Sequence, residues 1–250
     1  MAKPPTKELV VVRSTQVTEH MLRITLGGEQ LAHLPEDQES AYIKLIFPQD
    51  EGERPLMRTY TIRHQRQAEI DVDFALHDQM GPASRWALNA QPGDRILIGG
   101  PGPRKLINPQ ADWFLLVGDM TALPAISVNL AELPANASGY AVIEVTSESD
   151  IQTLNHPEDV ELHWVINPEP DPEGMSLVSR VKALPWLSGQ VAVWAACEFN
   201  GMRALRQFFK QERVIAKSHL YISSYWKLGQ SEDGHKLAKK QYSELLATAV

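Results

Sequence analysis

The sequence WFLLVGDMTALPAI, residues 113–126, marks the point at which this chain of 250 residues changes its folding pattern. It begins with a continuous apolar run that ends at Gly118 and Asp119, and residues 121–133 then follow helical spacing. A strand that is apolar on both faces and leads through a tight turn into a helix is typical of a parallel sheet covered by helices. An α/β domain is therefore predicted to begin here.

The rest of the chain after this stretch repeats the same pattern. Apolar strands alternate with helical segments, with strands expected at 140–147, 160–167, 190–198 and 219–226 and helices at 175–184 and 200–213. Ligands of such a sheet bind at the carboxyl ends of its strands. Those ends carry the sequences GDMTALPA, TSES, NPEPD and ACEFNGM.

The chain before residue 113 has the rhythm of a β domain. Six short runs rich in Val, Ile, Leu and aromatic residues are separated by Gly, Pro and Asp: ELVVVRS, HMLRITL, AYIKLIF, MRTYTIR, EIDVDFAL and DRILIGG. In DVDFAL the alternation of apolar residues with Asp71 and Asp73 predicts one buried and one solvent-exposed face. GPASRWALN predicts one helix among these strands. We expect a six-stranded antiparallel β-barrel over residues 1–108, then a Rossmann-like parallel α/β domain over 109–250 with a C-terminal extension.

Composition excludes several classes of protein. Apolar residues make up 43% of the chain and charged residues 22%, as in an ordinary globular protein. The single cysteine, Cys197, excludes an internal disulfide and any multi-thiolate metal or iron–sulfur site. The sequence has no signal peptide and no membrane-spanning stretch, so we expect a cytoplasmic protein that does not bind membranes.

Charge is distributed unevenly along the chain. The net charge is −7, and residues 112–179 contain 12 acidic side chains but no Lys or Arg, whereas residues 180–250 contain 11 basic and 5 acidic ones. An acidic block followed by a basic one argues against a nucleic acid partner and leaves room for one cationic pocket. A solvated surface of uneven charge explains most of the pattern equally well.

The stretch RTYTIR, residues 58–63, brings together three side chains that suit a flavin dinucleotide. Arg58 and Tyr60 share one face of the strand, and Thr61 either points to the other face or ends the strand. A guanidinium forks onto phosphate oxygens, Tyr60 offers a flat ring, and Thr61 offers a hydroxyl and an N–H group. A strand with one exposed arginine and a cross-strand aromatic pair accounts for the same residues.

A second stretch, HDQMGPASRWA at 77–87, predicts a phosphate site at the start of a helix. Gly81 permits close backbone approach, Pro82 suits the first helical turn, and the N–H groups that follow have no partner within the helix. The alternative is a capped helix that crosses between strands, with Trp86 in the core.

Three features of the α/β half have two interpretations each. The turn after residue 118 occupies a dinucleotide position but lacks G-x-G-x-x-G spacing, so Thr121 either contacts a cofactor or caps the helix. Cys197 either lines a nicotinamide pocket or is a small buried residue, and Arg203 and Arg206 suit a solvated helix face. In SSYWKLG, residues 223–229, an aromatic residue either covers a flavin or closes the sheet.

The eight histidines show no metal-ligand spacing, so no bound metal is expected.

Seven stretches in order resemble the siderophore-interacting proteins, or ferric siderophore reductases, a branch of the ferredoxin–NADP reductase-like flavoproteins. They are AYIKLIFP, RTYTIR, HDQMGPASRWA, PGDRILIGGPGP, WFLLVGDMTALPAI, VWAACEFNGMRALR and YWKLG. The resemblance covers nearly the whole chain. The family more often has Ala-Gly-Glu at Ala196-Cys197-Glu198, and Gly-Tyr-Trp-Arg at Ser224-Tyr225-Trp226-Lys227. The second departure keeps the aromatic ring and the charge.

This resemblance implies an FAD-binding barrel and an NAD(P)H-binding α/β domain. Tyr60 and Thr61 would lie at the reacting ring, and residues 81–84 would hold the pyrophosphate. The implied cofactor-binding residues are Arg58, Tyr60, Thr61, His77, Gly81, Pro82, Ala83, Ser84, Asp119, Thr121, Ala122 and Trp226. Electrons would pass from reduced nicotinamide through FAD to siderophore-bound Fe(III), releasing Fe(II).

Ferric siderophores are often anionic, so the resemblance also implies a cationic substrate site. The candidates are Lys44, Arg104, Lys105 and Lys227, each of which is equally explained as a surface cation. Lys44 is the strongest, because the alternation in YIKLIF directs it away from the barrel core or into its mouth.

The end of the second α/β strand indicates the electron donor, because an Arg or Lys near this position usually binds the 2′-phosphate of NADPH. Here the sequence is EVTSESD, which is acidic, so NADH is predicted over NADPH. NADPH would instead be expected if the basic C-terminal segment (Lys236, Lys239, Lys240) folded over the nicotinamide site. A ferredoxin is a further possible donor. Another flavin-dependent reductase and a non-catalytic siderophore-binding protein are the alternative functions, and the second would leave the phosphate-binding stretches unexplained.

Overall fold

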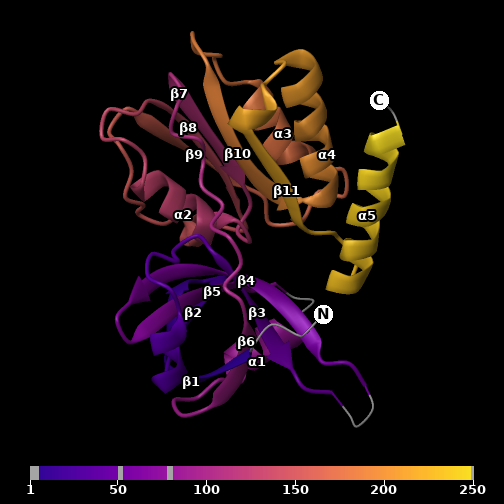
Figure 1. The fold of residues 1–250 in the computed structure, drawn as a ribbon. Coiled ribbons are helices and arrows are strands. Elements are labelled where there is room, and N and C mark those ends of the chain that lie inside the picture. The colour runs from indigo at the N-terminus through magenta and orange to yellow at the C-terminus, as the bar shows by residue number, and fades with distance from the viewer. Residues whose placement is uncertain (1–5, 50–52, 78–80, 249–250) are drawn as a thin grey trace. The chain divides into compact units, whose positions relative to one another are not determined.

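A computed structural model describes residues 6–49, 53–77 and 81–248 of the chain (Figure 1). The chain divides into two compact units. The first contains Met1–Leu106, Pro124–Glu132 and Ser149–Asn155, and the second contains Ile107–Leu123, Leu133–Glu148 and His156–Val250. Asp78, Gln79 and Met80, within the predicted phosphate-binding stretch, lie outside the described residues.

The first unit is built on a closed antiparallel barrel with the strand order β1-β2-β5-β4-β3-β6, which confirms the predicted architecture. Its strands are β1 (Thr6–Thr18), β2 (Met21–Gly27), β3 (Tyr42–Phe47), β4 (Leu56–Arg66), β5 (Glu69–Ala75) and β6 (Arg95–Gly99). A 3₁₀ turn, Glu29–His33, follows β2, and helix α1 (Pro82–Asn89) lies between β5 and β6. The barrel is filled by the inward-facing apolar residues of the strands, because alternate side chains of a strand point to the same face.

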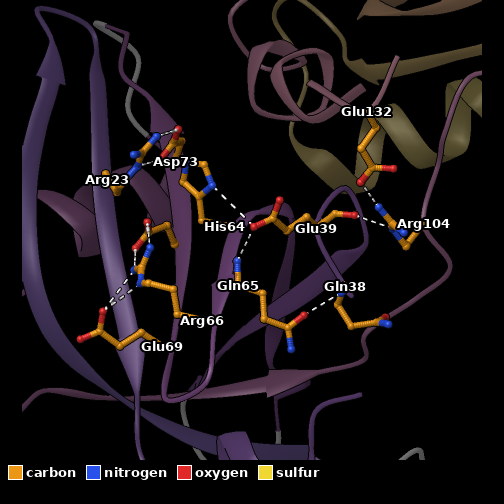
Figure 2. Close-up of polar contacts among 11 residues, drawn as sticks. Arg23, Gln38, Glu39, His64, Gln65, Arg66, Glu69, Asp73, Arg104 and Glu132 are labelled. Atoms are coloured by element: carbon orange, nitrogen blue, oxygen red, sulfur yellow. Dashed lines mark hydrogen bonds and ion pairs between the residues drawn. The ribbon is translucent and has the colours of Figure 1, made fainter. Parts of the chain in front are cut away.

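The outward face of β5 differs from the prediction. Asp71 and Asp73 are buried, at 3% and 6% exposure, although they alternate with the barrel core. The guanidinium of Arg66 forks onto Asp71 at 2.6 and 2.9 Å, and that of Arg23 forks onto Asp73 at 2.6 and 2.7 Å (Figure 2). Long guanidinium side chains cover the carboxylates and neutralise them, so this face is charged but shielded from water.

The second unit contains a five-stranded parallel sheet with the order β11-β10-β7-β8-β9, again as predicted. The strands are β7 (Trp113–Gly118), β8 (Gly139–Val145), β9 (Val160–Ile166), β10 (Val191–Glu198) and β11 (Leu220–Trp226). Every residue of β7 and β10 is buried, because both strands are central and are covered on both faces. Helix α2 (Leu123–Ala131) follows β7 in sequence but groups with the first unit, as does part of the connection after β8, which includes most of the 3₁₀ turn Glu148–Asp150.

Helices α3 (Met175–Lys182) and α4 (Phe199–Gln207) pack against the sheet and against each other. The segment predicted as one helix over 200–213 is α-helical only to Gln207 and continues as a π-helix over Phe208–Glu212. A 3₁₀ turn, Lys217–His219, precedes β11. The C-terminal extension forms a helix, α5 (Glu232–Thr248), that contacts β11 and was not predicted.

Candidate functional site

Strand β4 carries Arg58, Tyr60 and Thr61 on its two faces. Arg58 and Tyr60 are half-buried and are paired with fully buried Leu and Ile residues of β3. The ring of Tyr60 lies 4.3 Å from that of Phe74 at an angle of 37°, so the cross-strand aromatic pair is present. Thr61 is 9% exposed and is paired with Tyr42 on the other face. One wall of the barrel thus offers a cation and a flat ring on one face and a hydroxyl on the other.

Lys44 and Tyr42 lie on the Thr61 face of β3. The Nζ of Lys44 donates a hydrogen bond to Oγ1 of Thr59 and lies 5.9 Å from the centroid of the Tyr42 ring. Gly102 makes room for that ring, because a Cβ atom at this position would lie 2.1 Å from it. Tyr42 is a residue that the motifs did not identify. Its position next to buried Ile43 in the alternating sequence was the available signal.

Among the described residues, no side chain caps the start of helix α1. Its N-cap is Gly81 and its first residue is Pro82, so the N–H groups of the first turn receive no capping hydrogen bond from the Gly81 position. A Cβ atom at Gly81 would meet no atom within 4 Å, and the φ of −75° is open to every residue type. Packing among the described residues therefore gives no reason for a glycine, whereas close approach of a ligand does.

These features of the first unit fit a flavin dinucleotide. Arg58, Tyr60, Thr61 and the start of α1 belong to the same compact unit. They supply a guanidinium, an aromatic ring, a hydroxyl and backbone N–H groups, which are the partners that a pyrophosphate and a flat heteroaromatic ring require. Ala83 and Ser84 are buried in the first turn of α1, and His77 is exposed before it.

Arg104 belongs to a polar network that joins β4, the loop before β3 and Glu132, the residue that follows α2 (Figure 2). Its Nε donates to the backbone oxygen of Glu39 at 2.8 Å, and its guanidinium pairs with Glu132. The Oε1 atom of Glu39 accepts from the backbone N of Gln65 at 2.9 Å and lies 3.6 Å from Nδ1 of His64. Arg104 is thus engaged by protein groups, which counts against a role in substrate binding.

The other two cationic candidates are half-buried. The backbone oxygen of Lys105 accepts a hydrogen bond of 3.1 Å from Asn129 in α2. The Nζ of Lys227 lies 4.6 Å from the centroid of the Phe199 ring, in the second unit. Lys44, Arg104 and Lys105 lie together in the first unit.

Asp119 connects the carboxyl ends of three neighbouring strands of the second unit. Its Oδ1 accepts from N and Oγ1 of Thr121 at 2.9 and 2.5 Å, and its Oδ2 accepts from N of Glu198 at 2.9 Å and from Nε1 of Trp226 at 2.7 Å. Burial raises the pKa of the Asp119 carboxyl above its ordinary value, and these hydrogen bonds oppose the rise. The backbone oxygen of Asp119 accepts the N–H of Ala122 at the start of the helix. Thr121 is therefore held by Asp119, to which it donates both its backbone N–H and its hydroxyl.

Glu198 is a second buried carboxylate at this end of the sheet, and the sequence analysis did not identify it as a site residue. It is 7% exposed, and it caps α4 by accepting from the backbone N of Asn200 and of Gly201. It also accepts from N of Leu228 at 3.1 Å, which fixes the segment after β11 that carries Lys227. A carboxylate between an apolar strand and a helical segment was the available signal.

A small cavity opens at the same end of the sheet. Carboxylates dominate its polar lining, which includes Asp119, Glu144, Asp171 and Glu198 beside the thiol of Cys197. Burial and the nearby charge of Asp119 raise the pKa of Glu144 to about 7. Burial also raises the pKa of the Cys197 thiol, which keeps it protonated. Such a cavity repels phosphate groups and favours a neutral or cationic group.

The acidic segment after β8 is partly engaged by the barrel unit. Asp150 is fully buried and accepts hydrogen bonds from Oγ1 of Thr18 at 2.8 Å and from N and Nδ1 of His20 at 2.8 and 2.7 Å. Glu148 is exposed. Among the acidic residues of this segment, Asp150 thus has a structural role, because its carboxylate is held by Thr18 and His20.

The lysines of α5 have partners within the second unit. The Nζ of Lys239 donates to Oγ of Ser223 and to the backbone oxygen of Ser224, at 3.1 and 3.0 Å. Lys236 pairs with Glu232 and Asp233, and Lys240 lies 3.9 Å from Glu244. Within residues 6–49, 53–77 and 81–248, no group of three or more His, Cys, Asp or Glu residues is placed to hold a metal ion. Over the same ranges, no helix has the length and apolar character needed to span a bilayer.

Two protein families match the chain. The family described as "Siderophore-interacting FAD-binding domain" matches residues 10–53 and 49–105, and the family described as "Siderophore-interacting protein" matches residues 111–229. The Amycolatopsis cytochrome P450 reductase GcoB, at 19% identity and a TM-score of 0.65 over 90% of this chain and 72% of that one, shares the fold.

Relatives with higher identity extend over most of the chain. "Ferric vibriobactin reductase ViuB" of Vibrio cholerae is 35% identical over 90% of each chain, and "Ferric acinetobactin reductase" of Acinetobacter baumannii is 31% identical over 81% of this chain and 72% of that protein. The crystal structure of the siderophore-interacting protein SipS from Aeromonas hydrophila has a TM-score of 0.86 and 34% identity, covering 96% of this chain and 99% of that one. This chain belongs to the siderophore-interacting protein family.

Proposed function

We propose that this protein is an FAD-dependent ferric siderophore reductase that acts in the cytoplasm and prefers NADH to NADPH. The observation that carries the proposal is the start of α1, where Gly81 offers no side-chain cap and leaves open space among the described residues, in the same unit as Arg58, Tyr60 and Thr61. The names of the vibriobactin and acinetobactin reductases support the substrate class.

In this function the barrel unit holds the cofactor. Arg58 and the N–H groups after Gly81 bind the pyrophosphate, because a guanidinium and a helix N-terminus both favour phosphate. Tyr60 lies against the ring system, and Thr61 donates a hydrogen bond to it. When bound, FAD supplies the capacity to take up two electrons together and to release them singly.

The substrate is an anionic Fe(III) chelate, and cations guide it to the site. Lys44 is the principal candidate because it lies on the Thr61 face of the barrel and is half-buried, which strengthens its field. Lys227 is the candidate from the second unit, with Arg104 and Lys105 in supporting roles. Oxygen donors hold Fe(II) far less tightly than Fe(III), so reduction releases the metal.

The preference for NADH rests on the acidic end of the sheet. Asp119, Thr121, Ala122 and Trp226 are the proposed nicotinamide contacts. Glu144 and its neighbouring carboxylates disfavour an additional phosphate nearby, and residues 112–179 contain no Lys or Arg to bind one. The lysines of α5 have partners on α5 and β11, which supports the same preference. A ferredoxin is the alternative electron donor.

An absorbance spectrum tests both parts of the proposal. The purified protein, supplied with FAD, is expected to show flavin bands that NADH bleaches in the absence of air and that a ferric siderophore restores. A protein that stays colourless with excess FAD would overturn the cofactor assignment. A kcat/KM at least about tenfold higher with NADPH than with NADH would overturn the donor preference alone. If a reduced ferredoxin bleaches the flavin bands and neither NADH nor NADPH does, the electron donor is a ferredoxin.

A further inference from the structure

Helices α4 and α5 border an open groove in the second unit. It has a volume of about 430 Å³, which lies in the range of small-ligand sites. Three cations line it, together with one aromatic ring and several side-chain amides: Arg203, Arg206, Lys210, Tyr242, Asn200 and Gln207. We call this feature the α4–α5 groove.

The three cations of the groove have no ion-pair partner within the described ranges of the chain. The hydrogen bond given by Arg206 to protein runs from NH2 to the backbone oxygen of Ile222 at 3.1 Å. Its Nε is buried and has no hydrogen-bond partner in the part of the chain that the structure describes. Burial lowers the pKa of Arg206, since the desolvated charge lacks a carboxylate to offset it. Arg206 is half-buried and pairs with no carboxylate among the described residues, so an anionic ligand can supply the missing countercharge.

Tyr242 of α5 arranges the guanidinium groups. Its ring centroid lies 5.3 Å from the guanidinium carbon of Arg203 and 5.9 Å from that of Arg206. The ring attracts both cations and so keeps two like charges on the same side of α4, where they would otherwise repel each other. Arg203 is exposed, as expected from the spacing, whereas Arg206 is half-buried, and both guanidinium groups lie beside the same ring.

The spacing of the cations indicates the shape of the ligand. From residue 203 to residue 207 helix α4 rises by about 6 Å, at about 1.5 Å per residue, and Lys210 lies beyond it in the π-helix Phe208–Glu212. A single phosphate cannot contact both ends of such a row, whereas a chain of phosphates or carboxylates can. Guanidinium groups bind both kinds of oxyanion in a forked geometry, and the amides beside them can donate further hydrogen bonds. Glu173 also lines the groove, at the edge formed by the loop before α3.

We propose that the α4–α5 groove is a binding site for a small, extended polyanion, either an oligophosphate or a polycarboxylate, held by Arg203, Arg206 and Lys210. The site uses none of the residues assigned above to FAD, nicotinamide or ferric chelate. It is therefore independent of the proposed reductase activity.

Isothermal titration calorimetry with inorganic tripolyphosphate, citrate and orthophosphate tests the site on the full chain loaded with FAD. We expect tripolyphosphate, citrate or both to bind at least about tenfold more tightly than orthophosphate, and Arg203→Gln and Lys210→Gln each to weaken that binding by about tenfold. Both side chains are exposed, so these variants should fold normally, which circular dichroism checks. Arg206→Gln should have the largest effect.

Lys182→Gln is the matched control, because Lys182 is a surface cation of α3 that pairs with Glu212 and does not line the groove. Its polyanion affinity should equal that of the parent. Whether tripolyphosphate or citrate binds more tightly identifies the oxyanion class. Equal loss in Lys182→Gln and the groove variants would show a non-specific charge effect and overturn the proposal. So would heat of binding from a hexaglutamate peptide but from neither small anion, since the partner would then be an acidic protein segment.

Discussion

The indole Nε1 of Trp226 donates a hydrogen bond of 2.7 Å to Oδ2 of Asp119 and so ties the carboxyl end of β11 to that of β7, although β10 lies between them. Asp119 is 7% exposed and accepts hydrogen bonds from the main chain of β10 as well. One carboxylate thus holds three strand ends in place at the predicted nicotinamide position.

Replacing Asp119 with Ala is expected to destabilise the protein by about 2–4 kcal/mol, because buried donors of Thr121, Glu198 and Trp226 would lose their acceptor. Urea unfolding followed by tryptophan fluorescence measures the change. Asp159→Ala removes an exposed carboxylate and should change stability by less than about 0.5 kcal/mol. Equal effects of the two substitutions would contradict the role assigned to Asp119.

Glu144 should make the protein less stable as the pH rises. Its pKa is about 7 in the folded protein, against 4.5 as its ordinary value. The stabilisation from the bound proton is complete below pH 4.5 and is lost as the pH rises through 7. Glu144→Gln is therefore expected to be more stable than the parent at pH 8, by roughly 1–3 kcal/mol relative to their difference at pH 5. Denaturant unfolding at both pH values is the measurement, and a difference independent of pH would count against the prediction.

His235 should have the opposite effect on stability and make the protein less stable as the pH falls. Burial, with Lys239, Lys227 and Lys236 nearby, lowers its pKa to about 4 from an ordinary 6.5. The neutral ring, whose Nε2 lies 2.8 Å from Oγ of Ser224, stabilises the fold above pH 6.5, and this contribution is lost as the pH falls towards 4.

On acidification from pH 7 to 5 the parent should lose roughly 1–2 kcal/mol more than His235→Gln, which cannot titrate. Thermal unfolding at the two pH values measures it. If both proteins lose the same stability, the neutral state of His235 is not what holds α5 against β11.

Gly81→Val is expected to weaken FAD binding at least about tenfold while changing stability by less than about 1 kcal/mol. The reason is that the new side chain points into open space and its backbone conformation is unstrained, but it occupies the approach to the N–H groups of α1. Gly81→Ala should lie between the parent and Gly81→Val. Flavin fluorescence titration gives the affinity, and an unchanged affinity in both variants would remove this helix start from the cofactor site.

Lys44→Ala should lower kcat/KM for an anionic ferric chelate by about tenfold and leave FAD content unchanged, since the lost charge guides the substrate and not the cofactor. Added salt should reduce the difference between Lys44→Ala and the parent, because it screens the same attraction. Lys182→Ala serves as the control with equal loss of charge. Undiminished reduction by Lys44→Ala would favour a reductase that acts on free flavin or on an oxygenase.

The sequence by itself determined both architectures. A strand with one buried face alternates apolar and polar residues, as β3 and β5 do, and this pattern predicted the barrel. A strand buried on both faces is apolar throughout, as β7 and β10 are, and this pattern predicted the parallel sheet. The start of α1 was equally readable, because glycine and proline at a helix N-terminus act through backbone geometry. The division of Arg58, Tyr60 and Thr61 between two faces required only their spacing.

Tertiary structure alone decided which charged residues are engaged by the protein. Arg104 is paired with Glu132 and Asp150 with His20, and both pairs join residues far apart in the sequence; Asp71 is paired with Arg66 across the β4–β5 hairpin. The same holds for α5, whose mostly polar sequence forms a helix where His235 and Tyr242 pack on Phe199. Burial and long-range pairing set the energy of a charge, and both depend on contacts that exist only after the chain has folded.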